Sequence, residues 1–148
     1  MNTSFASMII NLATPNTPAL VLDHVFANYY LELESHLHKI KDAGVKVVSI
    51  GGGPRDIMVT ATQTFDPTAD INVLSTSIPT VWKSTDHLSI LWCKQLVFVI
   101  VRSLFDSVDY LEKPLKITSN STLKMQALSY HFQQVSRNCS LIFTATQF

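Results

Sequence analysis

The chain is poor in charge, glycine and cysteine, and each shortage excludes a class of protein. Charged residues make up 15% of the 148, and 11 basic residues balance 11 acidic ones. This neutral balance gives no electrostatic field that would attract nucleic acid, so we predict no nucleic-acid partner. Four glycines exclude collagen-like and linker-like chains. Two cysteines form neither a disulfide framework nor a CxxC motif, and we predict no metal and no cofactor.

The chain also has no long hydrophobic run. The longest one, Leu96–Val101, is far shorter than the roughly 20 apolar residues that a membrane span needs. No Lys or Arg precedes the first apolar cluster, Met8–Ile10, so the basic start of a signal peptide is missing. Asn-x-Ser/Thr triplets at Asn2, Asn120 and Asn138 would accept glycans only in the secretory lumen, and such triplets often arise by chance.

Apolar residues, in contrast, make up 47% of the chain, and the mean hydropathy is +0.21. Disordered chains combine low hydrophobicity with high charge, so this composition indicates a globular protein with an apolar surface that needs a partner. The length predicts a single domain, because a domain takes roughly 100–200 residues.

Short apolar runs alternate with patterns of helical period. The runs predict strands at 7–13, 45–50 and 72–78, with a brief extended segment at 57–59. Helical spacing of apolar residues predicts helices from Pro18 to Gly44, from about 88 to 108 and from about 122 to 135. This α/β order favours about three parallel strands with flanking helices. So small a sheet has exposed edges, which indicates part of a larger sheet.

Helix ends and buried faces are predicted from particular residues. We expect Thr17 to cap the first helix and Asp86 to cap the second. The second helix is apolar nearly all round, which is typical of deep burial. In the third helix we expect Leu128, Phe132 and Val135 to face inward, whereas the tail fits no pattern. The first helix carries one apolar stripe formed by Leu22, Val25, Phe26, Tyr29, Leu33, Leu37 and Ile40.

Asp56 is the first candidate functional residue. It follows Gly51–Gly53 just past the end of a predicted strand, where ligands and catalytic groups collect in open α/β sheets. One interpretation makes Asp56 the acid that orients a histidine. The other makes it a turn residue paired with Arg55 at the surface, and position alone favours this one. The glycines match neither GxGxxG nor a Walker loop, so a nucleotide site is not expected.

His87 is the second candidate. It follows a strand and loop and directly precedes a predicted helix, in the run Ser84–Leu88. A general base needs such a loop, because its imidazole must reach a nucleophile while a carboxylate holds the other ring nitrogen. An ordinary histidine at a helix start is an equal alternative. The other histidines, His24, His36, His38 and His131, lie within helix patterns and are interpreted as surface or core-edge residues.

A nucleophile is the missing part of this pattern. The sequence has no Gly-x-Ser-x-Gly and no serine on a glycine-flanked turn from strand to helix. In α/β-hydrolases the catalytic serine precedes the acid and the histidine along the chain. Asp56 followed by His87 matches the last two members of that order, and we expect the first to lie upstream of Met1.

Three segments resemble the GPI inositol-deacylase family. They are 9–15 (IINLATP), 49–56 (SIGGGPRD) and, most specifically, 79–96 (PTVWKSTDHLSILWCKQL). The resemblance covers roughly residues 7–135 and leaves 136–148 as an unplaced tail. It implies that 1–148 form the C-terminal part of a single lipase-like α/β-hydrolase domain.

The resemblance also implies an activity. The family hydrolyses the acyl ester on the inositol of GPI anchors, on the luminal side of the endoplasmic reticulum membrane, in quality control and export of GPI-anchored proteins. The GPI lipid is then the substrate partner, and membrane association comes through segments that this chain does not contain. Asp56 would be the triad acid and His87 the general base.

The chain departs from the family at two positions: Asn16 stands where a histidine is common, and Gly51 where alanine is frequent. Without its serine, the chain is expected to be inactive by itself. Two alternatives remain open, namely a non-catalytic truncated product that binds a partner through its exposed sheet edge, and an incomplete gene model.

Overall fold

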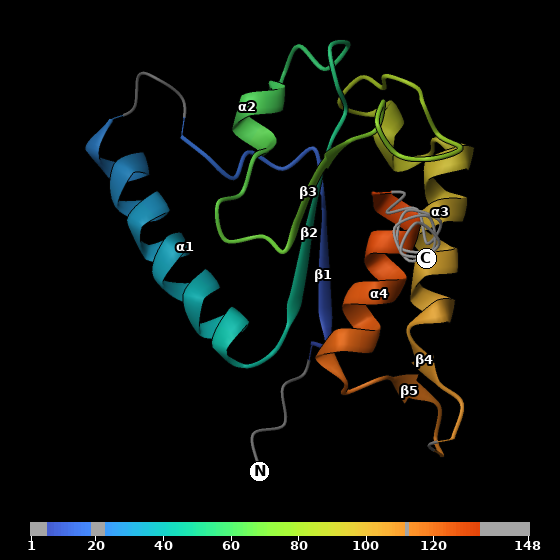
Figure 1. Ribbon diagram of the computed structural model, residues 1–148. Coiled ribbons are helices and arrows are strands. Elements are labelled where there is room, and N and C mark those ends of the chain that lie inside the picture. Colours follow the sequence, from blue (N-terminus) through green and yellow to red (C-terminus); the bar gives the residue numbers. More distant parts are fainter. Residues whose placement is uncertain (1–5, 19–22, 112, 134–148) are drawn as a thin grey trace, which may run out of the picture.

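A three-stranded parallel sheet forms the centre of the computed structural model, which describes residues 6–18, 23–111 and 113–133. The strands are β1 (Met8–Leu12), β2 (Lys46–Gly51) and β3 (Ile71–Leu74), in that spatial order (Figure 1). Ile10 lies opposite Val48, and Val48 lies opposite Ile71. The predicted α/β class with three parallel strands is confirmed.

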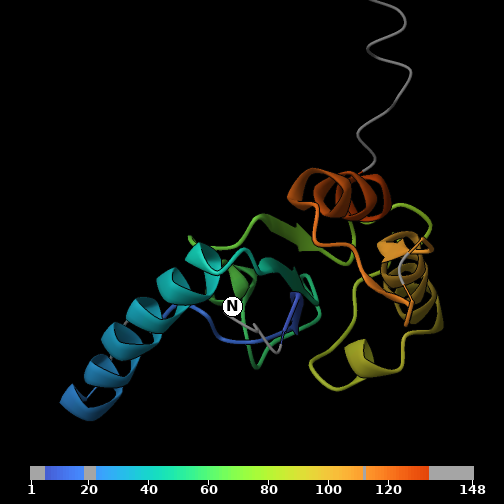
Figure 2. The same cartoon turned by 90° about the horizontal axis from the view of Figure 1, so that it is seen from below.

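Helices lie on both sides of this sheet. Helix α1 (His24–Asp42) lies on one side, and α3 (Lys94–Asp106) and α4 (Ser121–Phe132) lie together on the other (Figures 1 and 2). The remaining elements are α2 (Ala61–Thr64), the 3₁₀ turn η1 (Ser89–Leu91), and the antiparallel pair β4 (Val108–Asp109) and β5 (Lys116–Ile117). The strands β4 and β5 were not predicted, because two residues are too short for a recognisable pattern. Within the described residues, no helix is both long and apolar enough to cross a bilayer.

The core lies between the sheet and the pair α3 and α4. Val48 and Ile50 of β2 pack there with Leu96 of α3 and with Leu128 and Phe132 of α4, and all five are fully buried. The inward position predicted for Leu128 and Phe132 is therefore confirmed. Val135 and the tail 136–148 lie outside the described residues. Strand β1 is only half-buried, because it forms one edge of the sheet.

The predicted start of the first helix is wrong. Its N-cap is Asp23, whose carboxylate accepts the amides of Val25 and Phe26. Thr17 instead donates its hydroxyl to the carbonyl of Thr62. None of the residues of α1 is buried, and the stripe residues Val25 and Phe26 are 62% and 57% exposed. Helical period defines an apolar stripe but not what covers it.

The predicted continuous helix at 88–108 is also wrong. The carboxylate of Asp86 accepts the amides of Leu88 and Ser89, which closes the short turn η1 before α3 begins. Asp86 thus does not cap α3 but closes the turn that leads into η1, whose N-cap is Leu88, and α3 begins after an extended Cys93. The deep burial expected all round is not found, because α3 buries one face and leaves Phe98 52% exposed.

Two local expectations fail because of side-chain hydrogen bonds. The third strand ends at Leu74 rather than 78, since its carbonyl accepts both the amide and the hydroxyl of Ser77 in a turn. Residues 57–59 are a bend rather than a strand, since the amides of Met58 and Val59 bond to the Asp56 carboxylate. Both cases show short polar side chains drawing the backbone away from extended structure.

Candidate active site

Asp56 lies in the loop that follows β2, at the carboxyl end of the sheet. Its backbone amide donates to the carbonyl of Gly53 at 3.1 Å, and Oδ1 accepts the amides of Met58 and Val59 at 3.1 and 2.9 Å. The residue is only 4% exposed. Two backbone amides therefore hold the carboxylate through Oδ1, a third hydrogen bond fixes the Asp56 backbone, and Oδ2 faces elsewhere.

Oδ2 faces His87. The distance from Oδ2 to Nδ1 of His87 is 3.2 Å, although the two residues are 31 positions apart in the chain. The Asp56 side chain is fully buried, whereas that of His87 is 28% exposed. In the neutral tautomer that donates Nδ1–H to this carboxylate, Nε2 carries the lone pair with which an imidazole acts as a base.

The structure thus brings the two sequence-predicted residues together. Asp56 meets His87, so its ion-pair partner is not the Arg55 of the alternative interpretation. His87 does not start α3, because it stands before η1, whose N-cap is Leu88, and α3 begins only at Lys94. Their catalytic roles remain a prediction, to which we return below.

One carbonyl oxygen holds the two loops against each other. The carbonyl of Gly52 accepts the amide of Thr85 at 2.8 Å and the hydroxyl of Ser75 at 2.8 Å. The Ser75 hydroxyl also lies 2.7 Å from the carbonyl of Lys83, and Ser84 Oγ accepts the amide of Arg55 at 2.9 Å. The sequence analysis did not predict that Ser75, Ser84 and Thr85 join the two loops. The polar run just before His87 was the one pattern that could have indicated such contacts.

Glycine is needed where these loops touch. A Cβ on Gly52 would lie 2.8 Å from the carbonyl oxygen of Thr85 and 3.1 Å from Cβ of Asp56. Gly53 has φ +87°, a conformation that residues with a side chain rarely adopt. The glycine run therefore serves the close approach of the two loops, in agreement with the absence of a nucleotide-binding motif.

Asp86 is the acidic residue next to His87 in the sequence, but its carboxylate bonds to backbone amides instead. Its Oδ1 accepts the amides of Leu88 and Ser89 at 3.0 and 2.8 Å. Hydrogen bonds from the backbone and hydroxyl of Ser89 lower the pKa of Asp86 below its usual value. The residue is exposed and ionised, and its role is to shape the turn after His87.

A second histidine–carboxylate pair has the opposite burial. Nε2 of His131 lies 2.7 Å from Oδ2 of Asp106, and this contact joins α4 to α3. Here the imidazole is 11% exposed and the carboxylate 58% exposed. The His131 imidazole is therefore less accessible than that of His87. His24, His36 and His38 are exposed on α1, as predicted.

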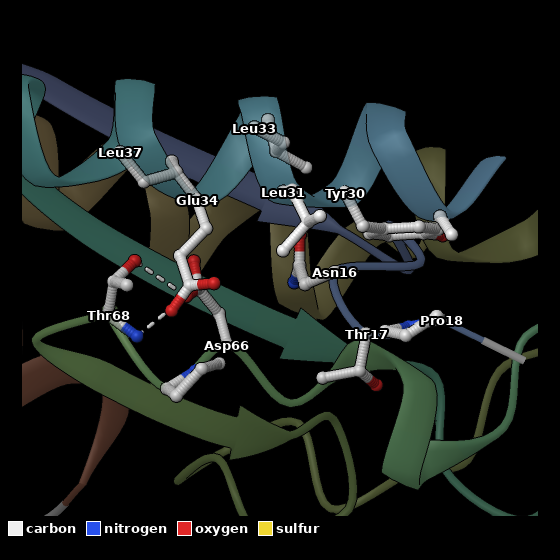
Figure 3. Close-up of a pocket in the computed structure, with 12 residues that line it drawn as sticks. Asn16, Thr17, Pro18, Tyr30, Leu31, Leu33, Glu34, Leu37, Asp66 and Thr68 are labelled. Atoms are coloured by element: carbon white, nitrogen blue, oxygen red, sulfur yellow. Dashed lines mark hydrogen bonds between the residues drawn. The ribbon is translucent and has the colours of Figure 1, made fainter. Parts of the chain in front are cut away.

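A largely apolar pocket of about 380 Å³ lies on the α1 side, away from the pair (Figure 3). Leu31 and Leu37 of α1 line it together with Asn16 and the buried Asp66, whose Oδ1 accepts the amide and hydroxyl of Thr68. Asn16 Nδ2 donates to the hydroxyl of Ser49 and the carbonyl of Thr64.

In the described part of the chain, no group of three or more His, Cys, Asp or Glu residues could hold a metal ion.

The class of this protein follows from the fold and from known relatives. A parallel α/β sheet with a histidine–carboxylate pair beyond its strand ends has the layout of hydrolase domains. Residues 3–107 match the family model described as PGAP1-like alpha/beta domain, and the chain belongs to this family.

The relatives that this chain matches carry an activity in their names. Proteins named GPI inositol-deacylase from Rattus norvegicus and Mus musculus are each 32% identical to this chain over 152 residues. The match covers 95% of this chain but 16% of either relative. The Xenopus laevis protein of the same name is 34% identical, with 85% of this chain and 14% of the relative covered. The chain therefore spans a small part of the length of the relatives it matches.

Proposed function

We propose that this chain carries the acid and the base of a GPI inositol-deacylase, which hydrolyses the acyl ester on the inositol of a GPI anchor. The name shared by its relatives supports the activity. The observation that carries the proposal is the 3.2 Å contact between Nδ1 of His87 and Oδ2 of the fully buried Asp56. We place the reaction at the luminal face of the endoplasmic reticulum membrane, in quality control and export of GPI-anchored proteins.

In the proposed mechanism, each residue of the pair has its own role. Nε2 of His87 takes the proton of a serine hydroxyl as its oxygen attacks the ester carbonyl, and Asp56 stabilises the imidazolium that forms. The same proton then passes to the inositol oxygen as the carbon–oxygen bond breaks. This leaves an acyl-serine and a free inositol hydroxyl. Water, deprotonated by His87, hydrolyses the acyl-serine and releases the fatty acid.

We propose that the serine lies outside these 148 residues. The sequence contains no Gly-x-Ser-x-Gly, and residues 7–135 would form the later part of the catalytic domain. The chain by itself is then expected to be inactive, since a triad without its serine loses about 10⁶ in turnover in the subtilisin case. Deacylation by the purified 148-residue chain, abolished by His87→Ala, would refute this part of the proposal.

The role of the pair is tested in an active deacylase that contains this sequence. We expect Asp56→Asn to lower turnover by about 10⁴, as loss of the triad acid does in other serine hydrolases, with expression near normal. His87→Gln should lower it at least as much. Asp106→Asn and His131→Gln are matched controls, because they alter the other histidine–carboxylate pair. Equal losses in both pairs would indicate a folding effect and contradict the assignment.

A second candidate function rests on the edge of the sheet. β1 is an edge strand of the described sheet, and exposed edges pair readily with other strands. A non-catalytic product could then associate with a complete deacylase through β1. Co-purification of the two, lost in Ile10→Pro but kept in Ile10→Val, would support this function, whereas hydrolysis sensitive to Asp56→Asn would favour the enzyme.

A further inference from the structure

Arg55, Lys83 and Lys94 line one pocket of about 280 Å³ beside the Asp56–His87 pair. These three residues come from three separate segments, the loops after β2 and β3 and the first turn of α3. We call the cavity that they line, together with Ser89 and Trp92, the basic pocket. In a chain of zero net charge, three cations on one cavity are a local concentration of positive charge.

These cations have no carboxylate of their own. In the described part of the chain, none of the three salt bridges involves Arg55, Lys83 or Lys94. Lys94 Nζ lies 5.8 Å from the ring centre of Phe98, a contact that leaves its charge uncompensated. Asp86 is the acidic residue that lines the pocket, and its Oδ1 already accepts two backbone amides. The pocket therefore keeps an excess of positive charge.

The backbone adds to this preference for anions. Cys93, Lys94 and Gln95 line the pocket and are the N-cap and first residues of α3. The Cys93 side chain makes no capping hydrogen bond, and no acidic residue occupies the first turn. The start of a helix carries partial positive charge and unpaired amides. Together with the three cations, it favours a compact anion with several acceptor oxygens.

Residues that line the pocket are the sequence neighbours of the candidate pair. Arg55 directly precedes Asp56, and Asp86 directly precedes His87. The amide of Arg55 donates to Ser84 Oγ at 2.9 Å, so the two loops that hold the pair also form the pocket. An anion bound there lies between the loops that carry the pair and the first turn of α3.

From these observations we infer that the basic pocket binds a phosphate group, as part of a phosphodiester head group whose polyol is presented to His87. Arginine and lysine together with free amides are the donors that phosphate oxygens prefer in proteins. Presentation of the polyol to His87 rests on the proposed function. Binding of the phosphate does not, so the two can fail separately.

Binding is measured on the 148-residue chain with glycerophosphoinositol, a phosphodiester without acyl chains. Its titration should shift the amide NMR signals of Lys94 and Gln95 saturably. We expect Arg55→Gln/Lys83→Gln to weaken binding by roughly tenfold or more, because each charged hydrogen bond contributes about one such factor. Lys39→Gln on α1 is the matched control and should bind as the parent does. Added salt should weaken binding.

Two further titrations separate the sources of the phosphate. Inorganic phosphate that shifts the same amides shows a site for phosphate itself, whereas shifts confined to phosphatidylcholine vesicles containing phosphatidylinositol show a lipid head group. The inference is overturned if no probe shifts these amides, or if Lys39→Gln weakens binding as much as the double variant. His87→Ala should bind the phosphate normally, so intact binding together with unchanged turnover of this variant in an active deacylase would count against the proposed function alone.

Discussion

The carbonyl of Gly52 and the amide of Thr85 form a 2.8 Å hydrogen bond that joins the loop after β2 to the loop that carries His87. These two loops are far apart in sequence, and each holds one member of the pair. The same contact explains the glycine, because a Cβ at position 52 would lie 2.8 Å from the carbonyl oxygen of Thr85. Orientation of the pair thus depends on backbone packing as well as on the two side chains.

Gly52→Ala should therefore separate the two loops. The added methyl also lies 3.1 Å from Cβ of Asp56, so neither neighbour can move away freely. We expect a loss of about 1–3 kcal/mol in the free energy of unfolding, as for other overpacked sites. Urea unfolding measures this loss. The downfield Nδ1–H NMR signal of His87 should weaken in the variant, and an unchanged signal would show that the pair does not depend on this contact.

Removal of the Ser75 hydroxyl should have a similar effect without any clash. Ser75 is fully buried, and its Oγ lies 2.8 Å from the carbonyl of Gly52 and 2.7 Å from that of Lys83. Ser75→Ala leaves these carbonyls with fewer donors, which costs about 1–3 kcal/mol. Ser77→Ala is the control, since Ser77 is exposed and bonds only locally to Leu74. Equal stability of the two variants would contradict the role assigned to Ser75.

Lys124 should make stability depend on pH in the alkaline range. It is 4% exposed, and its Nζ contacts the carbonyls of Ser7 and Gly44 at 3.4 and 3.3 Å. Burial, helped by the charge of Lys46 and opposed by Asp70, lowers the pKa of Lys124 below 10.5. The unfolded chain then holds the proton to higher pH than the folded one.

The contribution of Lys124 to the free energy of unfolding therefore rises with pH as this side chain loses its proton. It levels off above pH 10.5. Lys124→Met removes this rise, so the stability of the parent relative to the variant should increase from neutral pH toward 10.5. Denaturant unfolding across this range provides the measurement. For Lys116→Met on β5, an exposed lysine, the difference in unfolding free energy from the parent should not change with pH. If the difference for Lys124→Met is also constant with pH, the proposed effect of the buried Lys124 is excluded.

Local patterns were good guides to some parts of the fold. The β-branched run at 45–50 with its glycine stop predicted β2 almost to the residue, because strand propensity and the turn after it are local properties. The end of α1 was also predicted correctly, since Gly44 has φ +79° and lysines occupy the last turn. The division of 88–106 into η1 and α3 was missed, because the Asp86–Ser89 contacts compete with helix continuation.

The sequence by itself determined the α/β class, the three strands and the identity of two candidate residues, since each depends on residue type, spacing or a family motif. Tertiary structure decided that Asp56 and His87 touch, that the His131–Asp106 pair is buried the other way round, and that three scattered cations line one pocket. Such proximity depends on how loops from separate strands pack. No local pattern encodes a distance between residues that only the folded sheet brings together.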